Sequence, residues 1–138
     1  IYDSTDVKRV LALGADGVQV ATRFVTTEEC DADIRYKEAY INAAKEDIKI
    51  VKSPVGMPGR AIMNSFMERV MGGEKIPHSP CHRCLAKCDP ANIPYCITDG
   101  LINAVKGNIE NALLFCGAKA YRAEKIETVK DVVQALFA

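Results

Sequence analysis

Hydrophobic positions recur every three to four residues along much of the chain, a spacing that predicts amphipathic helices. The sequence also supplies helix-end signals, such as Ser4-Thr5-Asp6 before the first helical stretch and Gly14 after it. Thr26 and Glu29 have the spacing of a capping box, as do Thr128 and Asp131. The helices predicted from these signals cover residues 4–13, 26–44, 58–71, 97–105, 109–115 and 128–136.

Two short segments have the pattern of β-strands instead. Val18, Val20 and Thr22 alternate with Gln19 and Ala21, which predicts a strand over residues 17–24. Residues 48–51 form a second, shorter apolar run. A strand flanked by helices indicates an α/β fold. The pattern is that of a (β/α)₈ barrel, but most of the barrel's repeats are missing from this chain. Residues 74–94 have neither period and are expected to form a long loop.

The composition is that of a globular domain. The chain has 138 residues, of which 49% are hydrophobic and 26% are charged. Its 18 basic and 18 acidic residues cancel, so we expect neither a nucleic-acid partner nor a membrane surface. Four of its six cysteines lie within residues 81–96, which favours a reducing compartment and predicts a cytoplasmic protein.

The predicted strand at residues 17–24 has features of a phosphate site. In a (β/α)₈ barrel, backbone N–H groups near the last strands bind the phosphate of a flavin or a sugar. At this position Ala21 and Thr22 would offer two N–H donors, and Thr22 also a hydroxyl. These two residues are therefore the predicted cofactor-binding residues, and an ordinary buried strand is the alternative interpretation.

Four segments together resemble one family. They read LALGADGVQVATRF at 11–24, EECDADIRYKEAYINA at 28–43, SPVGMPGRAIMNSF at 53–66 and NALLFCGAKAYRAEKIETVKDVVQAL at 111–136. The sequence resembles the C-terminal part of the nitronate monooxygenase family, formerly 2-nitropropane dioxygenases, which includes flavin-dependent enoyl-acyl-carrier-protein reductases. The resemblance implies an FMN-binding TIM (β/α)₈ barrel with a C-terminal helical extension, acting on a small-molecule nitronate or enoyl thioester.

The resemblance also implies how the chain is organised. Residues 1–52 would be the last α/β unit of the barrel, and residues 53–138 the mainly helical extension with a cysteine-rich loop at 74–96. The remaining strands, with the family's catalytic histidine, would precede Ile1 in a longer parent protein, so the fragment alone is expected to be inactive. A barrel strand without its neighbours has unpaired edges, which makes a homodimer plausible.

Two local features bear on the flavin site. The family usually has glycine where Ala21 stands, and the extra Cβ is expected to hinder close approach of a phosphate. Gly117-Ala118-Lys119 aligns with a Gly-Gln segment that lies near the flavin ring in the family, although a helix ending at Gly117 explains it equally well.

The cysteine-rich loop is a candidate metal site. Cys81, Cys84, Cys88 and Cys96 follow one another at x2, x3 and x7 spacing, which suits a tetrathiolate site for zinc or an iron–sulfur cluster. The x2 and x3 spacing of the first three cysteines resembles that of the iron–sulfur loop of 2,4-dienoyl-CoA reductases. His78 and His82 are alternative ligands. Reduced, partly buried thiols are the other interpretation. The competing function is therefore a metal- or iron–sulfur-binding structural or assembly module.

Overall fold

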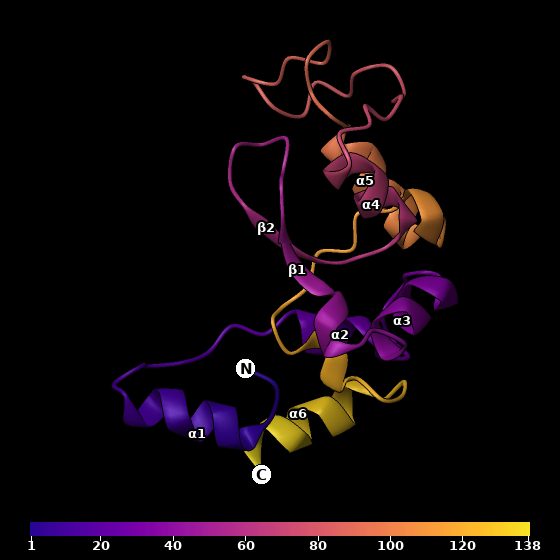
Figure 1. The fold of residues 1–138 in the computed structure, drawn as a ribbon. Coiled ribbons are helices and arrows are strands. Elements are labelled where there is room, and N and C mark those ends of the chain that lie inside the picture. The colour runs from indigo at the N-terminus through magenta and orange to yellow at the C-terminus, as the bar shows by residue number, and fades with distance from the viewer.

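The structure is a computed structural model that describes residues 1–138 and has a mixed α/β fold (Figure 1). A two-stranded hairpin lies in the middle, α1 and α6 lie together with both chain ends, and α4 and α5 lie beyond the hairpin. The elements in chain order are α1 (Ser4–Ala12), α2 (Thr22–Val25), α3 (Ile34–Ile41), η1 (Lys45–Asp47), β1 (Ile48–Val51), β2 (Gly59–Ile62), α4 (Ser65–Met71), α5 (Ile97–Val105), η2 (Ile109–Asn111), η3 (Ala120–Arg122) and α6 (Val129–Phe137).

The first and last helices form a small unit of their own. The N-cap of α1 is Asp3, one residue before the predicted cap, and its side chain accepts the N–H of Asp6 at 3.1 Å. The predicted capping box at Thr128 is present at the start of α6. Val7 of α1 is 5% exposed and packs in one cluster with buried side chains of α6, which are Val132 and Leu136. Packing between the two ends of the chain thus follows from two short amphipathic helices.

The strand predicted over residues 17–24 is wrong. Residues 17–21 belong to no helix or strand, and Thr22–Val25 forms the single turn α2. A strand requires hydrogen bonds to a neighbour, and the one sheet of the chain contains only β1 and β2. The residue pattern was therefore that of a strand, but this chain supplies no partner for it.

The helix observed within the predicted range of residues 26–44 is less than half as long as predicted. It begins at Ile34 as α3, where the Asp33 side chain accepts the N–H of Arg35 at 2.9 Å. Thr26 does not cap a helix, because the backbone there pairs with a distant segment. Glu127 N–H donates to the Thr26 carbonyl at 3.1 Å, and Glu28 N–H donates to the Glu127 carbonyl at 2.9 Å. This tertiary pairing overrides a local capping signal.

The predicted strand at residues 48–51 is confirmed as β1. It pairs antiparallel with β2, with Ile48 opposite Ile62 and Val51 opposite Gly59. β2 occupies the region where the sequence predicted the start of a helix at Pro58. That helix begins at Ser65 as α4, where the Asn64 side chain accepts the N–H of Met67 at 2.9 Å.

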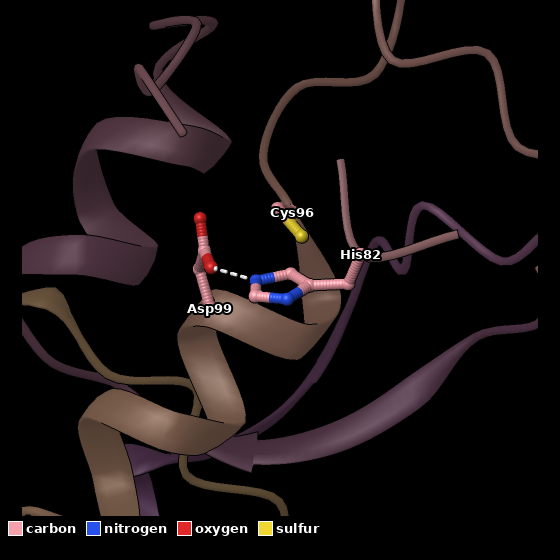
Figure 2. Close-up of side chains that lie close together, drawn as sticks. All are labelled: His82, Cys96 and Asp99. Atoms are coloured by element: carbon pink, nitrogen blue, oxygen red, sulfur yellow. Dashed lines mark hydrogen bonds and ion pairs between the residues drawn. The ribbon is translucent and has the colours of Figure 1, made fainter. Parts of the chain in front are cut away.

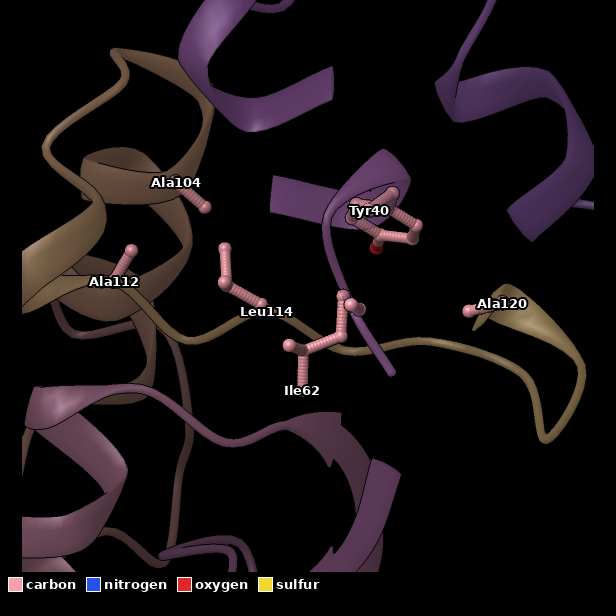
Figure 3. Packing of buried hydrophobic residues seen from close by; sticks show 7 residues of the cluster. Tyr40, Ile62, Ala104, Ala112, Leu114 and Ala120 are labelled. Carbon is pink, nitrogen blue, oxygen red and sulfur yellow. The ribbon is translucent and has the colours of Figure 1, made fainter. Parts of the chain in front are cut away.

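The segment after α5 runs alongside β2 instead of forming the helix predicted over residues 109–115. Only Ile109–Asn111 is helical. Beyond it, Ile62 N–H donates to the Leu114 carbonyl at 3.0 Å and Cys116 N–H donates to the Arg60 carbonyl at 2.9 Å. This pairing places Leu114 in the central cluster with Tyr40, Ala104, Ala112 and Ala120 (Figure 3). The helix predicted over residues 97–105 is confirmed as α5.

Residues 74–96 contain no helix or strand, as the sequence predicted. The two ends of this loop meet where Ile76 N–H donates to the Pro94 carbonyl at 2.8 Å. Tyr95 anchors the exit of the loop, since it is 1% exposed and lies edge-on to Phe66 with ring centroids 5.2 Å apart. No helix has the length and apolar character needed to cross a bilayer.

Candidate functional site

The predicted phosphate-binding residues lie at the start of α2. Ala21 is the N-cap residue and Thr22 is the first helical residue. The backbone N–H groups of both residues donate to no acceptor within the chain. These two donors are therefore available to an external group.

A second predicted segment lies next to them. Gly117 N–H donates to the Thr22 hydroxyl oxygen at 2.8 Å, although the two residues are 95 positions apart. A Cβ on Gly117 would lie 3.2 Å from that oxygen, so the close approach favours glycine here. Gly117 does not end a helix, which removes the alternative explanation of this segment. Ala21, Thr22 and residues 117–120 line one pocket of about 230 Å³.

The charged groups around this pocket are paired within the chain. Lys119 forms an ion pair with Asp6, whose side chain is 7% exposed. The hydrogen bond from Lys119 lowers the pKa of Asp6, and burial opposes this shift. Tyr2 N–H donates a second hydrogen bond to the Asp6 carboxylate at 2.8 Å. Lys119 thus serves first to neutralise a buried carboxylate of α1.

Arg23, which follows Thr22, faces away from solvent. Its guanidinium forms an ion pair with Glu127 and lies 4.5 Å from the ring centroid of Tyr2. Lys37 is also buried, and its ammonium donates to the Thr27 carbonyl at 2.6 Å. Both side chains therefore hold the segment around α2 in place.

A second cluster of polar side chains lies where the cysteine-rich loop meets the start of α5 (Figure 2). His82 Nε2 lies 2.7 Å from Asp99 Oδ1, and Cys96 lies beside them. The ligand atoms of His82, Cys96 and Asp99 all lie within 4.8 Å of one another. Of the four predicted cysteine ligands, only Cys96 belongs to this group, and all six cysteines are free thiols.

The other thiols of the loop lie near this cluster. Cys84 Sγ accepts a hydrogen bond from the Thr98 hydroxyl at 3.1 Å. Burial, followed by the charges of Cys81, Cys84 and Cys96, raises the pKa of the Cys88 thiol. The sequence predicted His82 as an alternative ligand but did not predict that Asp99 would join it. Its position three residues after Cys96, one turn further along a helix, was the signal that would have found it.

The Asp99 carboxylate accepts several hydrogen bonds within the cluster. Ser79 N–H donates to its Oδ2 at 2.8 Å, and the Ser79 hydroxyl donates to Oδ1 at 2.8 Å. Burial raises the pKa of Asp99, but the hydrogen bonds from His82 and Ser79 outweigh it and lower the pKa overall. Asp99 therefore remains a carboxylate at neutral pH.

The cluster does not have the geometry of a serine nucleophile relay. Ser79 Oγ and Asp99 Oδ1 both approach the same nitrogen of His82, Nε2, at 3.1 and 2.7 Å. In a relay, the histidine bonds the serine with one ring nitrogen and the carboxylate with the other. The short distances between the ligand atoms of His82, Cys96 and Asp99 are instead a feature that a metal site requires.

Comparison with known proteins places the chain in a family. The family model of nitronate monooxygenase matches residues 1–138. A probable nitronate monooxygenase of Staphylococcus aureus strain Newman is 36% identical over 81 residues, which are 58% of this chain and 23% of that protein. The corresponding protein of strain JH9 is 35% identical over the same shares. This chain therefore matches less than a quarter of the length of these curated relatives.

Solved structures show the same fold. FabK from Thermotoga maritima superposes with a TM-score of 0.76 and 25% identity over 99% of this chain and 40% of that chain. A point mutant of that protein gives a TM-score of 0.74 and 23% identity, over 99% of this chain and 38% of that one. Because the family model covers every residue, the chain belongs to the nitronate monooxygenase family.

Proposed function

We propose that this chain is the C-terminal part of an FMN-dependent oxidoreductase. In the complete protein, residues 1–52 would form the last α/β unit of a (β/α)₈ barrel and residues 53–138 its helical extension. Membership of the nitronate monooxygenase family supports this proposal, as does the likeness to FabK over 40% of that chain. The observation that carries it is the pocket where the free N–H groups of Ala21 and Thr22 lie beside Gly117.

The residues of this pocket fit a phosphate. The N–H groups of Ala21 and Thr22 would donate to its oxygens, as in other backbone phosphate sites. The Thr22 hydroxyl oxygen already accepts the Gly117 N–H, so its own hydrogen is free to donate to a third phosphate oxygen. Gly117 thereby orients the Thr22 side chain, and the methyl group of Ala21 limits how closely the phosphate approaches.

The flavin ring would supply the oxidation–reduction chemistry, and this chain would hold one end of the cofactor. The substrate of the complete protein would be a nitronate or an enoyl thioester. The catalytic histidine of the family would lie elsewhere in that protein, so the isolated chain would show no turnover. In isolation, the unpaired backbone around residues 17–21 would favour association with a second copy.

FMN binding by the complete protein tests this proposal. Titration of the apoprotein, followed by flavin fluorescence, should give equal or tighter binding for Ala21→Gly. Ala21→Leu should weaken binding by roughly tenfold or more, because a bulky side chain at this position would block the phosphate. The matched control is Ala44→Leu at an exposed alanine outside the pocket. Unchanged affinity in Ala21→Leu would remove this site from the proposal.

The competing function is a metal-binding or iron–sulfur-binding module built on Cys81, Cys84, Cys88 and Cys96. It remains a prediction, and the grouping of Cys96 with His82 and Asp99 is the observation that favours some form of it. A flavin absorption spectrum of the complete protein, measured together with its iron and zinc content, separates the two functions.

A further inference from the structure

We propose that His82, Cys96 and Asp99, with Cys84 as fourth ligand, form a zinc site that fastens the cysteine-rich loop to the start of α5. This proposal is independent of flavin binding, because the site lies at the opposite end of the chain's fold from α1 and α6 (Figure 1). It also differs from a site made of the four cysteines, since an imidazole and a carboxylate replace Cys81 and Cys88.

The positions of three ligand atoms carry the proposal. His82 Nε2, Cys96 Sγ and a carboxylate oxygen of Asp99 lie within 4.8 Å of one another (Figure 2). Zinc bonds of roughly 2.0–2.3 Å in a tetrahedron place ligand atoms about 3.3–3.8 Å apart. Cys96 is the N-cap residue of α5 and Asp99 lies in its first turn, so the helix fixes these two ligands. His82 approaches from the loop and needs only a small shift to admit the ion.

The arrangement around Asp99 is that of an oriented metal ligand. Ser79 N–H donates to Oδ2 at 2.8 Å and fixes the carboxylate, so that Oδ1 faces His82. Metal-binding carboxylates are commonly held in this way by a second hydrogen-bonding group. With Zn²⁺ bound, the contact between His82 Nε2 and Asp99 Oδ1 would be replaced by bonds from both atoms to the ion.

Cys84 is the best-placed fourth ligand. Its sulfur accepts a hydrogen bond from the hydroxyl of Thr98, the residue next to Asp99. By contrast, the sulfur of Cys81 accepts a local hydrogen bond from Arg83 N–H at 3.4 Å. Arg83, between His82 and Cys84, has a φ of 53°, a left-handed value that is unusual outside glycine and that turns the chain sharply between the two ligands.

The donor set indicates the metal. Thiolate and imidazole ligands together with one carboxylate suit Zn²⁺ in a tetrahedral site. On binding, the thiols of Cys84 and Cys96 would each release a proton to solvent, and His82 would bind as the neutral imidazole. The resulting complex has two thiolates and one carboxylate around a doubly charged ion. No electron is transferred, so the site would be structural and would order a loop that has no helix or strand of its own.

Titration of the reduced 138-residue chain with Zn²⁺, and with Co²⁺ as a spectroscopic probe, tests the proposal. We expect one ion per chain, with the visible bands of tetrahedral Co²⁺ and a thiolate charge-transfer band. Replacing a direct ligand should weaken Zn²⁺ binding by more than about 100-fold, which is more than the loss expected when a residue that only hydrogen-bonds a ligand is replaced. The ligand variants are His82→Ala, Cys96→Ser and Asp99→Asn. Ser79→Ala should weaken Zn²⁺ binding by roughly 10-fold.

Matched variants separate this site from a tetrathiolate. Cys81→Ser and Cys88→Ser should leave Zn²⁺ affinity unchanged, as should Asp89→Asn at an exposed carboxylate in the same loop. The proposal is overturned if Cys81→Ser and Cys88→Ser abolish binding while His82→Ala and Asp99→Asn retain it. Absence of stoichiometric binding by the reduced chain, with its far-UV circular dichroism showing folded helices, would overturn it as well.

Discussion

The hydroxyl of Tyr40 offers a direct test of how the centre of the fold is held together. Tyr40 lies on α3, is 1% exposed, and donates its hydroxyl hydrogen to the carbonyl of Phe115. That carbonyl accepts no other hydrogen bond in the chain. Burial raises the pKa of Tyr40, so the hydroxyl stays protonated and remains a donor at any practical pH. The Tyr40 bond thus links α3 to the segment that runs beside β2.

Tyr40→Phe removes this bond and leaves the rest of the packing intact. The ring keeps its edge-on contact with Tyr36, whose centroid lies 5.2 Å away, so no cavity forms. The loss is that of a buried acceptor left without a donor, which costs about 1–3 kcal/mol of the free energy of unfolding. Tyr36→Phe is the matched control, since it loses only the 3.2 Å contact between the two hydroxyls. We expect it to cost less than about 1 kcal/mol, because Tyr36 is only partly buried.

Urea unfolding followed by circular dichroism measures both variants. The midpoint should fall for Tyr40→Phe with an unchanged dependence on urea, since the surface exposed on unfolding is the same. A Tyr40→Phe chain as stable as the original would refute the reasoning. Equal losses in the two variants would also refute it, because they would trace the effect to the hydroxyl pair and not to the Phe115 carbonyl.

Two further predictions concern stability. Gly59→Ala should destabilise the chain by about 1–3 kcal/mol, because the new Cβ would overlap the ring of Phe115. Gly17→Ala is the control, since its Cβ would contact no atom, and equal urea midpoints for the two variants would contradict the prediction. The pKa of Asp6 is lowered in the folded chain, chiefly by the hydrogen bond from Lys119, so the unfolded chain binds more protons in acid. The stability that this pair contributes should be complete above the unfolded pKa of about 4 and be lost as the pH falls through the lower folded value. Asp6→Asn should flatten the pH dependence of the free energy of unfolding in this range, as measured by urea unfolding. The same pH dependence in Asp6→Asn and in the original chain would exclude the pair as its cause.

The sequence predicted the elements whose signals are local. The capping box at Thr128 and the apolar stripe after it determine α6, and both lie within one short segment. The same holds for α5, which has a helical period, and for β1, which is a short apolar run. Gly14, with a φ of 94°, follows the C-cap residue of α1, where the sequence predicted that the helix ends. In each case the residues that decide the structure are neighbours in the chain.

The failures lie where a distant segment decides. Glu127 pairs with the backbone around Thr26 and prevents the capping box there from starting a helix. The hydrogen bond from Ile62 N–H to the Leu114 carbonyl likewise makes strand-like neighbours of two segments predicted as helices. Neither partnership can be derived from local periodicity, because each joins residues more than 50 positions apart, and tertiary pairing outweighs differences in helix propensity.

For the candidate sites as well, the sequence predicted individual residues but not the contacts between distant segments. The sequence predicted Ala21 and Thr22, and separately a role for Gly117, but not that Gly117 N–H bonds the Thr22 hydroxyl. At the second site, the cysteine spacing drew attention to thiols alone. The structure adds Asp99, whose carboxylate faces His82 only because the loop folds back on the start of α5. Side chains from two elements can be predicted to meet only when the path of the intervening loop is known.

Residues 17–21 show that a wrong element can still contain a correct prediction. Val18 and Val20 are partly buried against the cluster formed by α1 and α6, while Gln19 and Ala21 between and after them are exposed. The alternation in the sequence therefore predicted correctly which side chains face the core. It could not predict a strand, because alternation specifies the faces of the segment, whereas a strand also requires a neighbour for its backbone. A segment with strand-like faces and no neighbour in the chain is what the proposed barrel leads us to expect, since there the adjacent strands would come from outside residues 1–138.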